Sequence, residues 1–350
     1  MITIPITASR TYEVRIGSGL LAELGSQSRE LVKAETAVVV SDSTVFPLYG
    51  EYALSSLKKA GFRCLSFVFP AGEESKSAAT YLSLLGFLAE KRITRSDLLV
   101  ALGGGVVGDL TGFAAATYLR GIPYIQVPTT LLSAVDSSVG GKTAIDLPEG
   151  KNLVGAFYQP SLVFCDTDTL NTLPEDIFLD GCAEVIKYGI LFDPTLFSAL
   201  EESGPAFSRE QVIAACVKWK RDVVAQDEFD TGLRKMLNLG HTVGHGVEAG
   251  SQFALSHGKS VAIGTAIVTR AAASKGICSK ETETRILRCL EKFSLPVRTD
   301  FSPEQLAAYA LSDKKRRGGT VDLILPRQIG DCIIVPTSVE DIQSLIEAGV

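Results

Sequence analysis

Histidine is rare in this chain of 350 residues, and its three copies lie close together at His241, His245 and His257. His241 and His245 are four residues apart, so on a helix both rings project from one face. Imidazole is the commonest metal ligand, and its unperturbed pKa lies near neutral pH. The alternative is a chance grouping of buried, hydrogen-bonded histidines. We interpret the cluster as a place of metal or proton chemistry, with His241 and His245 as the first candidates for ligands.

Two segments at the ends of expected strands suit a nucleotide cofactor. The glycine-rich segment 103–109 follows one strand and opens a helix, where glycines and helix N–H groups can cradle a phosphate. It lacks the Lys-Ser/Thr pair of a Walker A loop and the spacing of the dinucleotide fingerprint, so a tight turn without a ligand is the alternative. Asp42, after an earlier strand, suits ribose hydroxyls or, alternatively, caps the next helix.

Basic residues recur in places where a surface role is an awkward explanation. Lys142 and Lys151 follow glycines, and Lys187 comes three residues after Glu184, on the same face of a helix. Others of this kind are Lys220, Arg234 and the run 313–317. Together they favour a pocket for a phosphate and a carboxylate. Single lysines are usually solvated, however, and the run 314–317 is equally well explained as a charged loop.

Short apolar strands alternate with amphipathic helices in the first half of the chain. The expected strands cover 36–41, 64–69, 98–102 and 124–127, and the expected helices include 48–60 and 78–91. This alternation predicts parallel βαβ units in a doubly wound, Rossmann-like sheet. In such a sheet ligands bind beyond the carboxyl ends of the strands, where the polar and glycine-rich segments lie.

After Pro174 the sequence changes character. Residues 176–310 carry Ala, Glu, Lys and Leu at helical spacing. The clearest later elements are helices over 212–224 and 260–273 and strands over 320–325 and 331–335. We therefore expect an α/β domain over 1–174 followed by a mostly α-helical domain over 175–350.

The overall composition excludes several classes of function. A net charge of −6 argues against a nucleic acid or an anionic membrane as the main partner. No window approaches the roughly 18 consecutive apolar residues of a membrane span. The seven cysteines include no CxxC pair, which favours reduced thiols in a cytoplasmic protein. The first residues lack the pattern of a signal peptide.

Taken together, ten segments resemble the 3-dehydroquinate synthases from about Asp42 to Gly330. The segments are 70–76, 103–109, 116–121, 128–132, 135–142, 150–157, 181–188, 234–242, 257–258 and 313–315. The resemblance implies an NAD-binding α/β domain, a mostly helical metal- and substrate-binding domain, and a homodimer. Its departures are Asp146, where many members carry Asn, and Leu239, where an aromatic residue is usual.

The activity that this resemblance implies converts 3-deoxy-D-arabino-heptulosonate 7-phosphate into 3-dehydroquinate and phosphate, a step of the shikimate pathway. NAD is used without being consumed. A ring alcohol is oxidised, which acidifies the neighbouring C–H, and phosphate leaves by β-elimination. The ketone is then reduced, the ring opens, and an intramolecular aldol reaction closes the carbocycle.

The resemblance also assigns roles to individual residues. It implies that Glu184, His241 and His257 hold Zn²⁺ or Co²⁺, and that His245 serves in proton transfer or binds an oxyanion, in place of the His241/His245 ligand pair. The implied substrate contacts are Asp136, Lys142, Asn152, Lys187, Lys220, Arg234, Asn238 and Lys315. The implied NAD contacts are Asp42, Glu73, Lys76, Gly104, Gly105, Asp109, Thr129, Thr130, Lys151 and Thr172. Arg120 would reach the phosphate in the neighbouring subunit's site.

Three alternatives stay open. The first is a sister sugar-phosphate cyclase, a 2-epi-5-epi-valiolone or 2-deoxy-scyllo-inosose synthase, with the same fold, metal and NAD. The second is a metal-dependent polyol dehydrogenase, against which the basic pocket speaks. The third is a non-catalytic protein that binds metal or senses NAD. The pairs 151–152 and Arg234/Asn238 favour dehydroquinate synthase among these.

Overall fold

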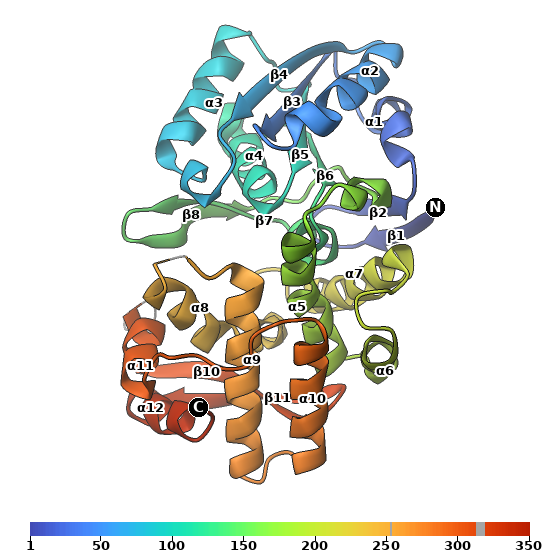
Figure 1. The fold of residues 1–350 in the computed structure, drawn as a ribbon. Helices are drawn as coiled ribbons and strands as arrows, with labels where there is room; N and C mark the ends of the chain where they lie inside the picture. The colour runs from blue at the N-terminus through green and yellow to red at the C-terminus, as the bar shows by residue number, and fades with distance from the viewer. Residues whose placement is uncertain (253, 313–318) are drawn as a thin grey trace. The chain divides into compact units, whose positions relative to one another are not determined.

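The computed structural model describes residues 1–252, 254–312 and 319–350. The described chain forms two compact units (Figure 1): the first holds Met1–Pro174 with Arg209–Glu228, and the second holds Glu175–Ser208 with Phe229–Val350. The chain leaves the first unit after Pro174 but returns to it for helix α7 (Arg209–Gln226). The domain expected over 175–350 is therefore interrupted, because α7 packs on strands β1 and β2 of the first unit.

The first unit is built on a sheet that has seven strands within the described residues, in the order β1-β2-β9-β6-β5-β3-β4. The strands are β1 (Ile2–Ile6), β2 (Tyr12–Gly17), β3 (Thr36–Asp42), β4 (Arg63–Phe69), β5 (Leu98–Gly103), β6 (Tyr124–Pro128) and β9 (Leu162–Asp166). Neighbours are parallel apart from the β1–β2 pair. The strands expected from the sequence are β3 to β6, which are continuous apolar runs because helices cover both faces of the sheet.

Alternate side chains of each strand enter different cores. Val39 packs with Leu24 and Leu57 on one face, while Val38 packs with Leu84 and Leu110 on the other. This follows from the two-residue period of a strand. The helices concerned are α1 (Leu24–Leu31), α2 (Glu51–Lys59), α3 (Ala78–Glu90) and α4 (Gly105–Thr117). The helix expected over 48–60 begins instead as a separate short turn, η2 (Phe46–Gly50), before α2.

Shorter elements of the first unit carry many of the expected site residues. An antiparallel hairpin joins β7 (Lys142–Leu147) to β8 (Gly150–Phe157). Short helical turns are η1 (Leu20–Glu23), η3 (Glu73–Ser75), η4 (Tyr118–Arg120), η5 (Ser133–Ser137) and η6 (Thr167–Asn171). They follow strands or helices at points where the chain turns, so their side chains are placed by the regular elements on either side.

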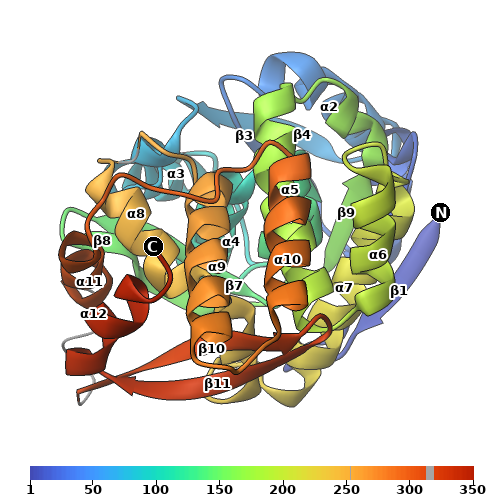
Figure 2. The same cartoon turned by 60° about the horizontal axis from the view of Figure 1, so that its bottom comes forward.

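The second unit is mostly helical, as the sequence predicts. Its elements are α5 (Glu175–Leu191), α6 (Pro194–Ser203), η7 (Leu233–Asn238), α8 (His241–Gly250), α9 (His257–Ser274), α10 (Lys280–Lys292), α11 (Pro303–Ser312), β10 (Thr320–Gln328), β11 (Asp331–Ser338) and α12 (Val339–Glu347). The antiparallel β10–β11 hairpin packs against α9 (Figure 2). None of the described helices is long and apolar enough to cross a membrane.

Glycines let α9 approach its neighbours very closely. A Cβ atom on Gly264 would lie 2.0 Å from the carbonyl oxygen of Gly240, and one on Gly244 would lie 2.9 Å from that of Ser260. Gly240 also has φ of 76°, a left-handed conformation that favours glycine. These contacts bring the N-terminal part of α8 against the backbone of α9.

We expect Gly264→Ala to destabilise the protein by about 1–3 kcal/mol, since the new methyl group would overlap a backbone oxygen. Differential scanning calorimetry would show a lower Tm. Gly86→Ala is the matched control, because Gly86 lies in α3, where an added methyl group would have no heavy atom within 4 Å apart from its chain neighbours and the backbone of its own helix. There alanine should stabilise by about 0.4–1 kcal/mol. Equal shifts for both variants would contradict the close-packing argument.

Candidate functional site

Three helices of the second unit bring a carboxylate and two imidazoles together. Glu184 lies in the middle of α5, while His241 and His257 are the first residues of α8 and α9. One Glu184 oxygen, Oε1, lies 3.4 Å from Nε2 of His241 and 3.4 Å from Nε2 of His257. The Glu184 side chain is only 1% exposed. The structure thus groups the three residues that the family resemblance implies as ligands.

The geometry of His241 indicates that a cation belongs in this group. Its Nδ1 lies 3.1 Å from the carbonyl oxygen of Leu239. A carbonyl oxygen only accepts hydrogen bonds, so Nδ1 carries the proton, and in the neutral ring Nε2 presents its lone pair to Glu184. Burial, together with the Lys187 cation, lowers the pKa of His241 to about 3 despite the Glu184 charge. A lone pair facing a carboxylate oxygen is repulsive unless a cation lies between them.

The donor set fits a divalent transition metal. Ligand atoms from Glu184, His241 and His257 all lie within 4.8 Å of one another. Two imidazole nitrogens and one carboxylate oxygen are ligands that Zn²⁺ and Co²⁺ accept, with coordination positions left for a substrate. Lys187 also forms an ion pair with the second oxygen of Glu184, so part of the buried negative charge is already compensated.

His257 lies between two carboxylates. Its Nδ1 is 3.6 Å from Oε2 of Glu248, whose side chain is 7% exposed. Burial lowers the pKa of His257, but the carboxylates of Glu184 and Glu248 raise it to about 10. His245, Glu248 and His257 form a second group of candidate ligands among the described residues. A carboxylate therefore lies near each ring nitrogen of His257, and the two together favour a positive charge at this place.

His245 differs from the other two histidines in exposure. It is exposed, and its ring lies edge-on to that of His241 with centroids 5.5 Å apart. It does not belong to the Glu184 group. The four-residue spacing alone therefore does not identify the Glu184 group, because Glu184 comes from a helix far away in the sequence.

Other expected substrate residues of the second unit lie on elements next to this group. Lys187 is one turn after Glu184 and is 1% exposed. Arg234 is almost fully buried on η7, and Asn238 ends the same turn as a half-buried residue. The turn η7 ends three residues before α8 begins, so Arg234 and Asn238 come shortly before His241 along the chain. Lys315 and the run 313–317 lie outside the described residues.

In the first unit, Lys220 of α7 meets Asp136 of η5. The ammonium group donates to the carbonyl oxygen of Asp136 at 2.7 Å and forms an ion pair with its carboxylate. Lys220 is 6% exposed, so the pairing compensates a nearly buried charge. The return of α7 to the first unit is what joins these two expected substrate contacts.

A second polar cluster surrounds Lys76. Its ammonium group lies 2.6 Å from the Asp109 carboxylate and donates to Oδ1 of Asn152 at 2.5 Å. Burial lowers the pKa of Lys76, but the carboxylates of Asp109 and Glu73 raise it further, so Lys76 stays charged. Lys151 lies 3.4 Å from Glu73. Four expected NAD contacts and one expected substrate contact thus lie within a single network.

Asp146 belongs to this network, although sequence reasoning gave it no role. Its carboxylate accepts the backbone N–H of Asn152 at 2.7 Å, and its own N–H donates to the carbonyl of Lys76. Asn152 has φ of 57°, so this hydrogen bond supports a conformation that is uncommon outside glycine. In the sequence, only the departure from Asn at this position pointed to Asp146.

Lys142, an expected substrate contact, begins the same hairpin and is exposed.

The glycine loop lies at the carboxyl ends of β5 and β6. Gly104 precedes α4, whose first residue is Gly105, and a Cβ on Gly104 would lie 3.1 Å from Thr130. Thr129 donates its N–H to the carbonyl of Gly103 at 3.0 Å. These four expected NAD contacts therefore occupy one strand-to-helix edge, where free helix N–H groups can meet a phosphate.

Asp42 and Thr172 already have local partners. Asp42 accepts the backbone N–H groups of Thr44 and Val45 at 2.8 and 2.9 Å, which is the capping role that the sequence left open. The hydroxyl of Thr172 lies 2.5 Å from that of Tyr49. Neither contact occupies every acceptor of these side chains, so both remain predicted NAD contacts.

Arg120 lies in an unusual turn. Leu119, Arg120 and Gly121 all have positive φ, of 51°, 67° and 118°. The guanidinium group of Arg95 holds the carbonyl oxygen of Leu119 at 2.7 Å. Such strain persists only where the surroundings impose it. It places Arg120 as an exposed residue at the end of α4 and η4.

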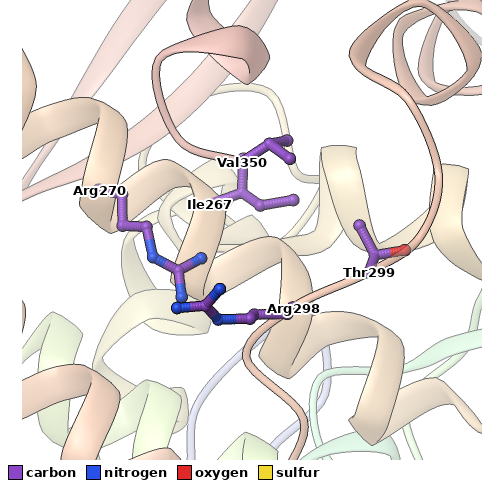
Figure 3. Close-up of a pocket in the computed structure, with 5 residues that line it drawn as sticks. All are labelled: Ile267, Arg270, Arg298, Thr299 and Val350. Atoms are coloured by element: carbon purple, nitrogen blue, oxygen red, sulfur yellow. The ribbon is translucent and has the colours of Figure 1, made fainter.

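A separate small cavity of about 150 Å³ lies in the second unit (Figure 3). It is lined by Ile267, Arg270, Arg298, Thr299 and Val350. Arg270 lies 13 positions after His257 on α9, or about 20 Å along the helix. Its guanidinium group already donates to the carbonyls of Val297 and Gly349, so it attaches these segments to α9. This cavity is distinct from the Glu184 group.

Comparisons with known proteins agree on one family. A model described as 3-dehydroquinate synthase N-terminal matches residues 66–180, and one described as 3-dehydroquinate synthase C-terminal matches residues 181–316. The chain is 45% identical over 343 residues to the 3-dehydroquinate synthase of Pelobacter propionicus, with 96% of each covered.

Solved structures show the same fold in sister enzymes. A 2-deoxy-scyllo-inosose synthase complexed with carbaglucose-6-phosphate, NAD⁺ and Co²⁺ matches 100% of both chains, with a TM-score of 0.89 and 27% identity. The 2-epi-5-epi-valiolone synthase of Streptomyces hygroscopicus, with NAD⁺ and Zn²⁺ bound, matches 98% of both chains, with a TM-score of 0.87 and 27% identity. The two family models together match residues 66–316, and the Pelobacter propionicus enzyme is more similar in sequence to this chain than either of these two structures is. The chain therefore belongs to the 3-dehydroquinate synthase family.

Proposed function

We propose that this protein converts 3-deoxy-D-arabino-heptulosonate 7-phosphate into 3-dehydroquinate and phosphate, using NAD and a divalent metal without net oxidation. The observation that carries the proposal is the buried Glu184 carboxylate, which faces the Nε2 atoms of His241 and His257 in a chain 45% identical to the 3-dehydroquinate synthase of Pelobacter propionicus. This group fits a metal, and the family relationship supplies the substrate.

The residues around the Glu184 group would divide the chemistry between them. Glu184, His241 and His257 would hold Zn²⁺ or Co²⁺, which supplies a Lewis acid that lowers the pKa of a substrate hydroxyl. Lys187, buried beside Glu184, would keep positive charge where an alkoxide develops. His245, exposed and outside the ligand group, would exchange protons, which a metal-bound imidazole cannot do freely.

Substrate anions call for cationic and amide groups. Arg234 offers the planar fork that binds a carboxylate or a phosphate with two parallel hydrogen bonds. Lys142, Asn152, Lys220 and Asn238, with Asp136, would bind hydroxyl, carboxylate or phosphate groups. We extend the same role to Lys315 from the family resemblance alone.

The first unit would hold NAD, the hydride acceptor of the reaction. The glycine loop at Gly104 and Gly105 would meet the pyrophosphate, because it presents helix N–H groups to an anion. The remaining acceptor of Asp42 would bind the adenosine ribose, and its charge would repel a ribose phosphate, which favours NAD over NADP. Glu73, Lys76, Asp109, Thr129, Thr130, Lys151 and Thr172 would complete the site.

We also propose a homodimer in which Arg120 acts in the neighbouring subunit. Arg120 is exposed, and it lies in a turn whose backbone is held in an uncommon conformation. A guanidinium group presented in this way suits a phosphate that lies outside its own subunit.

Phosphate release should follow many turnovers per NAD molecule, with no net NADH, when metal-loaded protein receives 3-deoxy-D-arabino-heptulosonate 7-phosphate. The reason is that the hydride removed early in the cycle is returned to the same substrate. Glucose 6-phosphate and sedoheptulose 7-phosphate serve as parallel substrates. Phosphate from only one of these would assign the protein to a sister cyclase. NADH accumulating with a polyol, and no phosphate from any sugar, would assign it to the dehydrogenases.

His257→Ala and His245→Ala should have different effects. We expect His257→Ala to lose bound metal and activity together, because it removes one of three ligands. His245→Ala should keep its metal but lose about 10²–10⁴-fold in kcat, the usual contribution of a general acid or base. Elemental analysis of the purified variants alongside kcat makes the comparison. Full metal content in His257→Ala, or metal loss in His245→Ala, would overturn these assignments.

Mixed dimers test whether Arg120 acts in the partner. Arg120→Ala and Lys187→Ala should each be inactive as homodimers. If the arginine acts across the interface, a mixed dimer contains one complete site, so random exchange in a one-to-one mixture should restore about a quarter of the wild-type activity. Arg120→Lys checks that the turn still folds when the charge is kept. No recovery after verified subunit exchange would place Arg120 in its own subunit's site or remove it from the mechanism.

A further inference from the structure

Asp180 links α5 to the first turn of α9. It lies four residues before Glu184, on the same face of α5. Its Oδ1 accepts the backbone N–H of Lys259 at 2.9 Å and also accepts a hydrogen bond from the hydroxyl of Ser256. These two donors flank His257 in the sequence. One carboxylate therefore holds the chain on both sides of a proposed metal ligand.

The first turn of α9 is capped from another helix. Ser256 is the N-cap residue, and a serine at that position ordinarily accepts an N–H from its own helix. Here its side chain makes no such bond and donates to Asp180 instead. Asp180 accepts the N–H of Lys259, which has no partner within the first turn of its own helix. A carboxylate at a helix N-terminus also interacts favourably with the helix dipole. The cap thus becomes a connection between α9 and α5.

Backbone packing reinforces this connection. A Cβ atom on Gly258 would lie 2.0 Å from the carbonyl oxygen of Asp180. Only glycine allows the chain next to His257 to lie this close to α5. The backbone and the side chain of Asp180 therefore fix the same short segment, one helical turn from Glu184.

The opposite side of His257 is held by Glu248 of α8, whose Oε2 lies 3.6 Å from Nδ1. With Nδ1 engaged there and the flanking backbone held by Asp180, Nε2 is left directed at Glu184. Outer groups of this kind orient metal ligands, and losing one typically weakens metal affinity about 10–100-fold.

We propose that Asp180 is a positioning residue that sets the place of His257 relative to Glu184 and thereby the affinity of the site for its metal. This inference rests on the metal site proposed above. Asp180 is not itself a member of either group of candidate ligands among the described residues. It acts through the segment 256–259.

The test compares three variants of the full-length protein by Co²⁺ titration and by the visible spectrum of the bound ion. Asp180→Ala removes both hydrogen bonds, so we expect Co²⁺ affinity to fall about 10–100-fold and the spectrum to change. Asp180→Asn keeps an oxygen that accepts both bonds and should retain most of the affinity. Should Asp180→Ala fold poorly, Ser256→Ala removes one of the two bonds and should weaken binding to a smaller degree.

Asp193→Ala is the matched control. Asp193 caps α6 of the same unit by accepting the N–H of Leu196 at 2.9 Å. It caps a helix that carries none of the three proposed ligands. Both alanine variants should lower the Tm of the metal-free protein by a few degrees, since each loses a helix cap. Only Asp180→Ala should weaken Co²⁺ binding.

Each outcome has a separate meaning. Equal Co²⁺ affinity in Asp180→Ala, Asp193→Ala and the unsubstituted protein would overturn the positioning role while leaving the metal site intact. An asparagine variant as weak as the alanine variant would overturn the hydrogen-bond argument. Absence of Co²⁺ binding by the unsubstituted protein would instead overturn the metal site on which the inference rests.

Discussion

The buried carboxylate of Glu184 is the constraint around which the second unit is organised. A charge that is 1% exposed is costly unless positive groups surround it. Lys187 supplies one such group, but the Nε2 of His241 presents a lone pair, because Nδ1 is committed to the carbonyl of Leu239. A cation between the carboxylate oxygen and this nitrogen would turn their repulsion into attraction. The arrangement of α5, α8 and α9 therefore makes physical sense as a metal site and much less as a packed core.

Glycines, more than the ligands themselves, allow this arrangement. Gly258 brings α9 against α5, while Gly240 and Gly264 bring α8 against α9 at distances that no side chain could tolerate. Interiors are close-packed, so a methyl group at such a point would move a helix and the ligand that it carries. The first unit solves a related problem with paired charges. Lys220 meets Asp136 and Lys76 meets Asp109, which lets an acidic protein keep cations in largely buried positions.

The sequence predicts local elements better than their partners. Strands such as β3 could be predicted, because a parallel strand covered on both faces is a continuous apolar run. The position of α7 could not be predicted, since the helical spacing of apolar residues does not say which unit the helix will pack against. Glu184 lies 57 positions before His241, so no local spacing could join them, and only the family resemblance did so. Asp180 carries no pattern at all, because its role depends on a segment 76 positions away.

The two nearby histidines have different surroundings despite their helical spacing. His241 and His245 share a helical face, yet only His241 begins α8, where the preceding carbonyl of Leu239 can fix its ring. One turn later His245 is exposed and lies edge-on to His241. A metal-bound ring has no lone pair left for a proton, whereas an exposed ring outside the ligand group can gain and lose one. The same four-residue repeat thus places one ring inside the Glu184 group and the other outside it, which is the arrangement that the proposed division between metal binding and proton transfer requires.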